Sequence, residues 1–215
     1  QLIRFADDPA QSGWQIRLPR DWITVRKEAP SASGLKAKAQ SLLFSGGPIA
    51  ASEIKVLRVP LNSKSETMDF FLDKSPVMTK EQAAAGLSRS YEKKPSTFRF
   101  KLLGNTSTAE RAGNRYLRYS FSVSRCEGTQ LTDAEGQKSC VKPGEKYATE
   151  LTKMDTVARH WEVATTVTQE RAAGGAPYAL WLVECSVPSE TWKDTASTIN
   201  AIMDSFAVGA KKDLE

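Results

Sequence analysis

The chain has a single histidine, His160, so any mechanism that needs an imidazole has to use this one. Glu162 follows two positions later in the run VARHWEVATTV at 157–167, whose alternation of residue types predicts a β-strand. Side chains two apart on a strand share a face, so the imidazole and the carboxylate should lie together. Such a pair can begin a binding site for a divalent cation such as Ca²⁺, Mn²⁺ or Zn²⁺, although two ligands bind only weakly.

The alternation also predicts which way His160 points. Trp161, Val163 and Val167 fall on the more apolar face of this strand, which should meet the core. His160 and Glu162 fall on the opposite, more polar face. We therefore favour an exposed histidine, its charged form favoured by the neighbouring glutamate, over a metal site. We expect no tightly bound cofactor, and at most a weak divalent cation site at this pair.

No motif for enzyme chemistry accompanies His160. The sequence has neither of the glycine-rich loops that commonly bind nucleotide phosphates, no HExxH zinc motif and no GxSxG nucleophile elbow. No serine or cysteine stands in a recognisable nucleophile context that this histidine could activate. We therefore predict that the protein is not an enzyme. The alternative is a small-ligand binder or enzyme that uses the His160 face, with polar groups around a pocket near Tyr116 and Arg118.

Two of the three cysteines stand where a disulfide is geometrically reasonable. Cys126 and Cys140 bracket the polar loop EGTQLTDAEGQKS, near the base of a predicted hairpin. A disulfide there would contribute roughly 3 kcal/mol in the chain-entropy model and would imply an oxidising compartment, whereas the alternative is two free thiols. Cys185 lies in the apolar run LWLVECSV, which predicts a buried free thiol. The spacing of the cysteines matches no zinc pattern.

The elements that must position these residues are about eight short strands and two helices. Strands are predicted at 13–18, 41–46, 52–61, 98–103, 114–124, 146–154, 157–167 and 178–187. The run YALWLV at 178–183 is apolar throughout, which is typical of a central strand covered on both faces. Strands joined mostly by hairpin-length turns, with helices laid on the sheet, predict one α+β domain without an internal boundary.

The ends of both helices can be read from the sequence. Thr79 and Gln82 form a capping box, which predicts a helix over KEQAAAGLSRSYEK at 80–93, just before Pro95. Ser189 is a suitable N-cap for a C-terminal helix. The apolar residues of that helix recur at alternating spacings of four and three, so this stripe should pack on the sheet: Trp192, Ala196, Ile199, Met203 and Phe206.

Charge narrows the classes of partner. The formal net charge of +5 and a pI near 9.1 suit docking on an acidic partner, but the dense basic clusters of a nucleic-acid-binding protein are missing. No apolar run is long enough to span a bilayer, and the start at Gln1 without a leader suggests a processed or trimmed chain. We expect a peripheral protein, monomeric when free. Taken singly, each basic residue of the sequence is more readily explained as a solvated charge than as a docking contact. Six of them are nevertheless candidate docking contacts: Arg17, Arg20, Arg26, Lys27, Lys36 and Lys38.

Four stretches, in order along the chain, together resemble the PsbP family. SGWQIRLPRDW at 12–22 resembles the family's opening strand, and YLRYSF at 116–121 fits its middle strand. RHWEVATTV at 159–167 is similar to a late strand of the family. LWLVECSVPSETWKDTASTINAIMDSFAV at 180–208 is similar to its closing unit, a strand ending near a cysteine followed by a tryptophan and a helix ending in Ser–Phe.

The resemblance implies an α–β–α sandwich with a central antiparallel sheet flanked by helices. It implies an N-terminal segment at 1–12, a single PsbP-like domain at 13–208 and a C-terminal tail at 209–215. It also implies a non-enzymatic protein of the chloroplast thylakoid lumen, an extrinsic subunit or an assembly or stability factor of a membrane-embedded photosynthetic complex. The complex expected first is photosystem II, whose extrinsic subunits help to retain Ca²⁺ and Cl⁻ at the oxygen-evolving site. Other family members act in photosystem I assembly or sit on the chloroplast NADH-dehydrogenase-like complex.

Three features depart from the founding members of that family. Only QLIRFADDPAQS precedes the first predicted strand, whereas the founding members carry a longer N-terminal arm. The insert that contains Cys126 and Cys140 is not typical of them either. The family's histidine, a proposed metal ligand, carries over to His160, but its partner carboxylate does not, because Ser189 stands three residues before Trp192, with Glu190 beside it. The short N-terminal segment and the insert favour a PsbP-like or PsbP-domain paralogue.

Overall fold

A seven-stranded antiparallel sheet forms the centre of the protein. The structure is a computed structural model that describes residues 2–5, 13–26, 40–46, 52–170 and 177–209. The strands of the sheet lie in the order β3-β4-β5-β11-β10-β7-β6. Their bounds, in that order, are Ile23–Arg26, Gln40–Gly46, Glu53–Leu61, Tyr178–Pro188, Val157–Gln169, Asn114–Arg125 and Arg99–Arg111.

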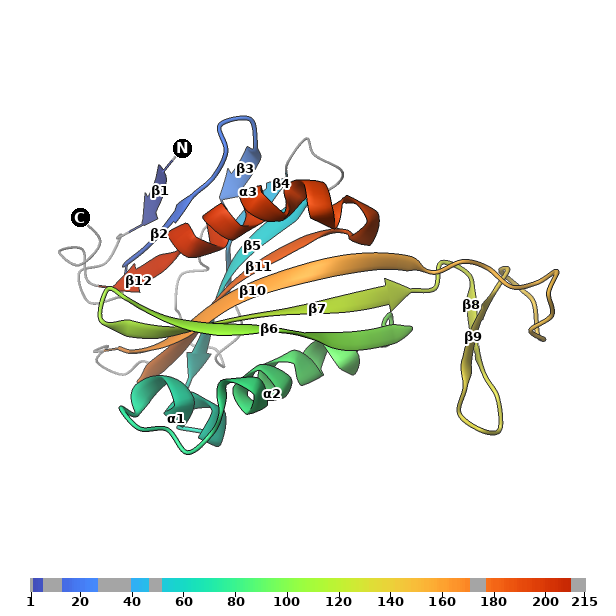
Figure 1. Cartoon of the computed structure of the whole chain (residues 1–215), viewed down its shortest axis with the longest axis horizontal. Coiled ribbons are helices and arrows are strands. Elements are labelled where there is room, and N and C mark those ends of the chain that lie inside the picture. Colours follow the sequence, from blue (N-terminus) through green and yellow to red (C-terminus); the bar gives the residue numbers. More distant parts are fainter. Residues whose placement is uncertain (1, 6–12, 27–39, 47–51, 171–176, 210–215) are drawn as a thin grey trace, which may run out of the picture.

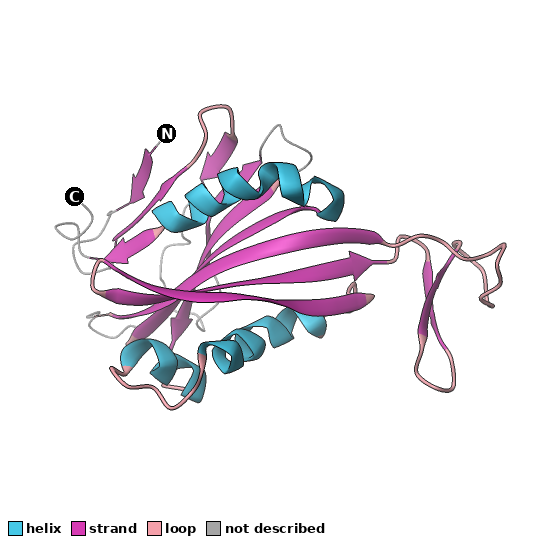
Figure 2. Cartoon of the chain, in the orientation of Figure 1, coloured by secondary structure: helices cyan, strands magenta, loops and turns pink. Residues whose placement is uncertain are grey.

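Helices cover both faces of this sheet (Figure 1). One face carries α1 (Glu66–Leu72) and α2 (Lys80–Glu92). The other carries the 3₁₀ turn η1 (Ser189–Thr191), α3 (Trp192–Ser205) and a three-stranded sheet of β1 (Leu2–Phe5), β2 (Gly13–Arg17) and β12 (Ala207–Gly209). Figure 2 shows the three layers and, at one end, the separate hairpin of β8 (Thr129–Thr132) and β9 (Lys138–Val141). The predicted α+β sandwich is therefore confirmed.

The two covered faces make two cores. Beneath α1 and α2, aromatic side chains dominate, with Tyr91 and Trp161 both packed against Phe121. Beneath α3 and the small sheet, Trp181 of β11 lies among Trp14, Ile16, Ile199 and Met203. β11 is the middle strand of the seven, and its successive side chains enter the two cores in turn. Its continuous apolar run was read correctly as a strand buried on both sides.

The helix signals were correct for α2 and partly wrong for α3. In α2, Thr79 Oγ1 accepts a hydrogen bond from Gln82 N at 3.2 Å, and Thr79 N donates to Gln82 Oε1 at 2.8 Å. In α3 the predicted apolar stripe does pack on the sheet, but Ser189 is not the N-cap. Instead, η1 tightens the chain directly after Pro188, so α3 begins only at Trp192. The hydroxyl of Ser189 is buried and finds no hydrogen-bond partner within the described residues.

Other elements were missed or misread in the sequence. The short helix α1 was not predicted, and the predicted strand at 146–154 is a set of turns in which only Lys153 bridges to Val141. The expected N-terminal segment contributes β1, which pairs with β2 from Leu2 opposite Arg17 to Phe5 opposite Trp14. The domain therefore begins before residue 13. Residues 210–215 of the expected tail lie outside the described residues.

Candidate functional site beneath helix α3

His160 is buried, which corrects the expectation of an exposed histidine. Only 6% of its surface is exposed. The parity prediction itself was right, because Trp161 and Val163 lie in the core beneath α1 and α2 while His160 points to the opposite face. That opposite face is not open to solvent, since η1 and α3 lie across it. The imidazole stacks on the indole of Trp192, with ring centroids 3.6 Å apart and an interplanar angle of 16°.

The predicted pairing of His160 with Glu162 is present inside this buried layer. Nε2 of His160 lies 3.1 Å from Oε1 of Glu162, and the imidazole is the donor because an ionised carboxylate only accepts. The second oxygen of Glu162, Oε2, accepts a hydrogen bond from Nε of Arg118 on β7 at 3.2 Å. Glu162 is only 4% exposed, so its charge is balanced by the guanidinium rather than by water.

Arg118 carries the network from the sheet to α3. Its Nη2 donates to Oδ1 of Asn200, and its Nη1 lies 3.4 Å from Oδ1 of Asp204. Asn200 and Asp204 lie one turn apart on the same face of α3. The guanidinium therefore uses all three of its nitrogens, two on α3 and one on the central sheet. A planar group with donors in a fixed fork suits this role better than a lysine would.

A second arginine binds the C-terminal end of α3, next to Arg118. Nη1 of Arg111, from the end of β6, donates to the carbonyl oxygens of Met203 at 3.0 Å and Phe206 at 3.3 Å. Its Nη2 donates to Oδ1 of Asp204 at 3.1 Å. Carbonyl groups at a helix C-terminus lack intrahelical partners and carry partial negative charge, so a guanidinium is stabilising there. Arg111 and Arg118 together attach α3 to the sheet through polar contacts as well as through the core.

The network is not arranged as a metal centre. No group of three or more histidine, cysteine, aspartate and glutamate side chains in the described part of the chain could hold a metal ion. Both oxygens of Glu162 are already engaged, one by His160 and one by Arg118. A cation at Glu162 would have to compete with the guanidinium charge 3.2 Å away. The weak divalent site at His160 and Glu162 stays a prediction, with this competition against it.

A small pocket lies beside the network. It has a volume of about 100 Å³ and is lined by residues of β6, β7, β10 and α3, among them Thr108, Tyr116, Arg118 and Asp204. His160 is not part of the lining. Pockets for metabolite-sized ligands usually measure roughly 300–1,000 Å³. The alternative of a pocket near Tyr116 and Arg118 thus has a structural counterpart, but it is too small to enclose such a ligand.

Cys185 lies on the same face as the network, and its thiol is not activated as a nucleophile. It stands opposite Glu162 in the β10–β11 register, and its thiol is buried and free. Burial, and to a lesser degree the charge of Glu162, raises the pKa of this thiol well above its usual range. The thiol is therefore protonated at neutral pH, and a thiolate beside His160 is not formed. The prediction of a buried free thiol is confirmed.

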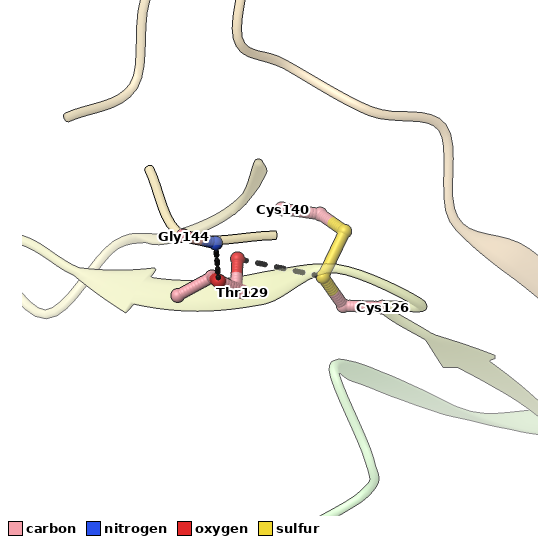
Figure 3. The surroundings of a disulfide bond; sticks show 4 residues. All are labelled: Cys126, Thr129, Cys140 and Gly144. Carbon is pink, nitrogen blue, oxygen red and sulfur yellow. Dashed lines mark hydrogen bonds between the residues drawn. A yellow bond between two sulfur atoms is a disulfide. The ribbon is translucent and has the colours of Figure 1, made fainter. Parts of the chain in front are cut away.

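The structure joins Cys126 and Cys140 in a disulfide, as their placement led us to expect. Their Cα atoms are 5.5 Å apart, and the bond connects the residue that follows β7 to β9 (Figure 3). Thr129 lies at the bond, with its carbonyl oxygen 3.6 Å from Sγ of Cys126. The hydroxyl of Thr129 accepts a hydrogen bond from Gly144 N at 3.2 Å, so the disulfide region is also tied to the following loop.

Three of the six candidate docking residues lie in the described part of the chain. Arg17 and Arg20 are exposed, at the end of β2 and in the turn after it. Arg26 is the last residue of β3, an edge strand of the large sheet. Lys27, Lys36 and Lys38 lie outside the described residues. The docking role of all six stays a prediction.

Sequence analysis missed a second buried acid on the other face of the sheet. Glu184 of β11 is 8% exposed and accepts a hydrogen bond from the hydroxyl of Tyr91 on α2. Burial raises the pKa of Glu184 to about 7, and the nearby charge of Lys55 opposes that rise. The signal was available, because a glutamate interrupts the continuous apolar run LWLVECSV. Its partner could not be read from the sequence, since Tyr91 lies 93 positions away.

Comparison with known proteins gives a fold and no family. No family model and no curated protein sequence matches the chain. The chain is similar to several solved structures, among them the following two. LpqN, involved in cell envelope biogenesis of Mycobacterium tuberculosis, has a TM-score of 0.50 and 11% identity, over 97% of this chain and 90% of that one. Cyanobacterial PsbP (CyanoP) from Synechocystis sp. PCC 6803 has a TM-score of 0.49 and 15% identity, over 96% of this chain and 92% of that one.

At 11% identity the likeness to LpqN establishes a shared fold and nothing more. No helix among the described residues is both long and apolar enough to cross a membrane. The residues brought together beneath α3 hold the layers of the sandwich to one another. His160 and Arg118 each have a hydrogen-bond partner in Glu162, and Arg118 has a further one in Asn200.

Proposed function

We propose that the protein is a non-enzymatic docking protein, a PsbP-like extrinsic subunit or assembly factor that binds a larger complex at a membrane surface. One observation carries the proposal: His160, the sole imidazole, is stacked on Trp192 and hydrogen-bonded to a glutamate that Arg118 neutralises. A general acid or base needs to reach a substrate proton, and a histidine that is 6% exposed beneath a helix does not. The residues most able to do chemistry instead stabilise the sandwich.

The resemblance of the four sequence stretches to the PsbP family supports a photosynthetic complex as the partner. On that basis the protein resides in the chloroplast thylakoid lumen, peripheral to the membrane, and binds the lumenal subunits of a membrane-embedded complex. Photosystem II, of the oxygen-evolving type, is the first choice. Photosystem I, in an assembly role, and the chloroplast NADH-dehydrogenase-like complex are the alternatives. The disulfide between Cys126 and Cys140 agrees with an oxidising compartment.

A second candidate function follows from the likeness to LpqN, a protein involved in cell envelope biogenesis. A docking protein of a bacterial cell envelope would share the fold, and the oxidising compartment implied by the disulfide would suit it equally. The two candidates differ in the partner and in the type of source organism. They agree that the protein acts by binding, outside the cytosol.

Fractionation of the source cells tests the proposal. The protein should co-sediment with thylakoid membranes and comigrate with a photosynthetic complex on native gels. Washing with about 1 M NaCl, where the Debye length is roughly 3 Å, should release it if docking is electrostatic. Recovery with the envelope of a non-photosynthetic cell would favour the second candidate. Recovery in the cytosol, unattached to any complex, would contradict both.

A further inference from the structure

A projecting arm, residues 126–156, extends beyond the end of the sandwich. It leaves at the end of β7 and returns at the start of β10, and it contains the hairpin of β8 and β9 (Figures 1 and 2). A hydrogen bond from Nζ of Lys138 to the carbonyl oxygen of Thr97, 3.4 Å long, links the arm to the body. An insert that adds nothing to either core must be explained by something other than the stability of the sandwich.

The arm is internally braced near its base. The disulfide between Cys126 and Cys140 closes the hairpin, and Val141 next to it is fully buried although it belongs to neither main core. Gly128 approaches the backbone of Val141 so closely that a Cβ at this position would lie 1.9 Å from the Val141 carbonyl oxygen. Met154 N donates to the carbonyl of Cys140 at 2.9 Å, so the returning chain is fastened to β9 as well.

The tip of the arm, the loop of residues 146–154 after β9, is ordered by two threonines. Thr149 N donates to Oγ1 of Thr152 at 2.7 Å, and Oγ1 of Thr152 donates to the carbonyl of Tyr147 at 2.8 Å. Thr152 N and Lys153 N both donate to the carbonyl of Thr149, at 3.1 and 3.0 Å. These contacts explain why 146–154 is a turn rather than the predicted strand, since threonine hydroxyls offer the backbone alternative partners.

This ordered tip holds large apolar side chains out in solvent. Tyr147 is 77% exposed and Leu151 is 84% exposed. Of the five large hydrophobic residues that are exposed in the described part of the chain, these two lie in this loop, and a third, Val157, is the first residue of β10, directly after the arm. A tyrosine and a leucine on a pre-ordered loop lose little conformational freedom on binding, which is the property of an interface anchor.

We propose that the arm is the principal docking element of the protein, and that Tyr147 and Leu151 insert into an apolar pocket of a folded protein partner whose surface is basic on the side of the hairpin. The proposal rests on the docking function proposed above and names the surface that performs it. The shape of the arm calls for a concave partner, since the arm itself is convex and projects from the body (Figure 1). Tyrosine anchors with a polar surround are typical of protein interfaces.

The charge of the arm argues for a basic partner surface on the side of the hairpin, because residues 127–138 carry three carboxylates and one lysine whereas residues 142–155 carry three of each. Residues 126–156 carry six carboxylates and four lysines, all exposed, although the whole chain has a net charge of +5. One of the lysines, Lys153, is paired with Glu150 at 2.9 Å. An acidic arm on a basic body disfavours an anionic lipid surface at this end of the molecule and favours a positively charged protein surface.

A rebinding assay with three purified proteins tests this inference. The probe is the membrane fraction of the source cells, washed with 1 M NaCl to remove the native protein, and the readout is the bound fraction after sedimentation. The proteins are wild type, Tyr147→Ser/Leu151→Ser and the control Val77→Ser. Val77 is fully exposed in the loop between α1 and α2, so it matches the change in surface hydrophobicity on a different part of the molecule. All three should keep the same far-ultraviolet circular dichroism, because the altered side chains are exposed.

The double variant should bind at least about tenfold more weakly than wild type, while Val77→Ser should bind like wild type. Equal binding of wild type and the double variant would overturn the role of the arm and leave the docking function intact. No saturable binding of wild type would overturn the docking function and, with it, this inference.

Vesicles of the extracted lipids, free of protein, should not bind wild type; if they bind it as well as the membranes do, the occupant is lipid. A dimer of wild type that the double variant abolishes would identify the occupant as a second copy. Either result would contradict a distinct protein partner.

Discussion

The imidazole of His160 stacks on the indole of Trp192, with 3.6 Å between the ring centroids, at the point where the central sheet meets the first turn of α3. The two residues come from different elements, and their contact closes one end of a polar layer that continues through Glu162 and Arg118. The sole histidine of the protein therefore contacts other side chains both on its ring face and at Nε2.

His160 should not support tight metal binding. Titration of Zn²⁺ or Mn²⁺ into the wild-type protein should give no calorimetric signal for a site tighter than about 1 μM, or roughly −8 kcal/mol. The reason is that Glu162 is neutralised by Arg118 and a third ligand is missing among the described residues. The matched control is His160→Ala. A submicromolar site that disappears in this variant would show that the metal-ligand interpretation of His160 was right.

Arg118 should be among the polar residues most costly to replace. Arg118→Met removes the charge that neutralises the buried Glu162, and losing one partner of a buried ion pair typically costs about 3–5 kcal/mol. Since Arg118 is partly exposed, we expect the lower end, a fall of about 3 kcal/mol in the free energy of unfolding measured with urea. Arg118→Met/Glu162→Gln should recover part of that loss. If the double variant is no more stable than Arg118→Met, the two side chains are not coupled.

Glu184 should make the protein less stable as the pH rises towards neutrality. Its pKa is about 7 in the folded protein against 4.5 for the usual carboxyl, so the folded state holds the proton more tightly than the unfolded state. The stabilisation is complete below about pH 4.5 and is lost as the pH rises through about 7, a total of about 3 kcal/mol. Glu184→Gln, which keeps an acceptor for Tyr91, should remove this dependence and exceed wild type in stability at pH 8. Parallel unfolding curves for the two proteins between pH 5 and 8 would contradict the buried, protonated state.

Mass spectrometry of the alkylated protein can show whether the disulfide is present. Alkylation of the unfolded, unreduced protein should add one group, at Cys185, and alkylation after reduction should add three. The pair Cys126→Ser/Cys140→Ser should loosen the arm, seen as faster amide hydrogen exchange around β8 and β9, while exchange in β10 and β11 stays slow. Three alkylated cysteines before reduction would show that Cys126 and Cys140 are free thiols.

Local sequence signals predicted a feature correctly where the residues of one short segment determine its structure. The capping box at Thr79, the two-sided strand of YALWLV and the placement of Cys126 against Cys140 all depend on short-range patterns. The burial of His160 depends instead on what lies above its strand. The side chains on the face that His160 shares with Ala164 and Thr166 are mostly small or polar. The core beneath α3 is nevertheless packed against that face. Alternation along one strand tells which residues share a face, but not whether another element covers that face.

The remaining misses have the same origin. Helix α1 has only seven residues and no side-chain cap, and Arg115 of β7 donates to the carbonyls of Phe70 and Asp73 at its end. β1 and β12 come from opposite ends of the chain and pair with β2 on either side. Contacts over such separations leave no periodic pattern in the sequence, so they became visible only in the folded chain.

Cross-linking mass spectrometry on intact membranes of the source organism tests the central claim most directly. An amine-reactive cross-linker would react with the exposed lysines of the arm, among them Lys142 and Lys146, while the protein is in its native place. A docking protein predicts reproducible cross-links from these lysines to one set of subunits of a membrane complex, and none from them to soluble enzymes. Cross-links confined to the protein itself, or spread over unrelated soluble proteins, would contradict the claim that it acts by docking on a larger complex.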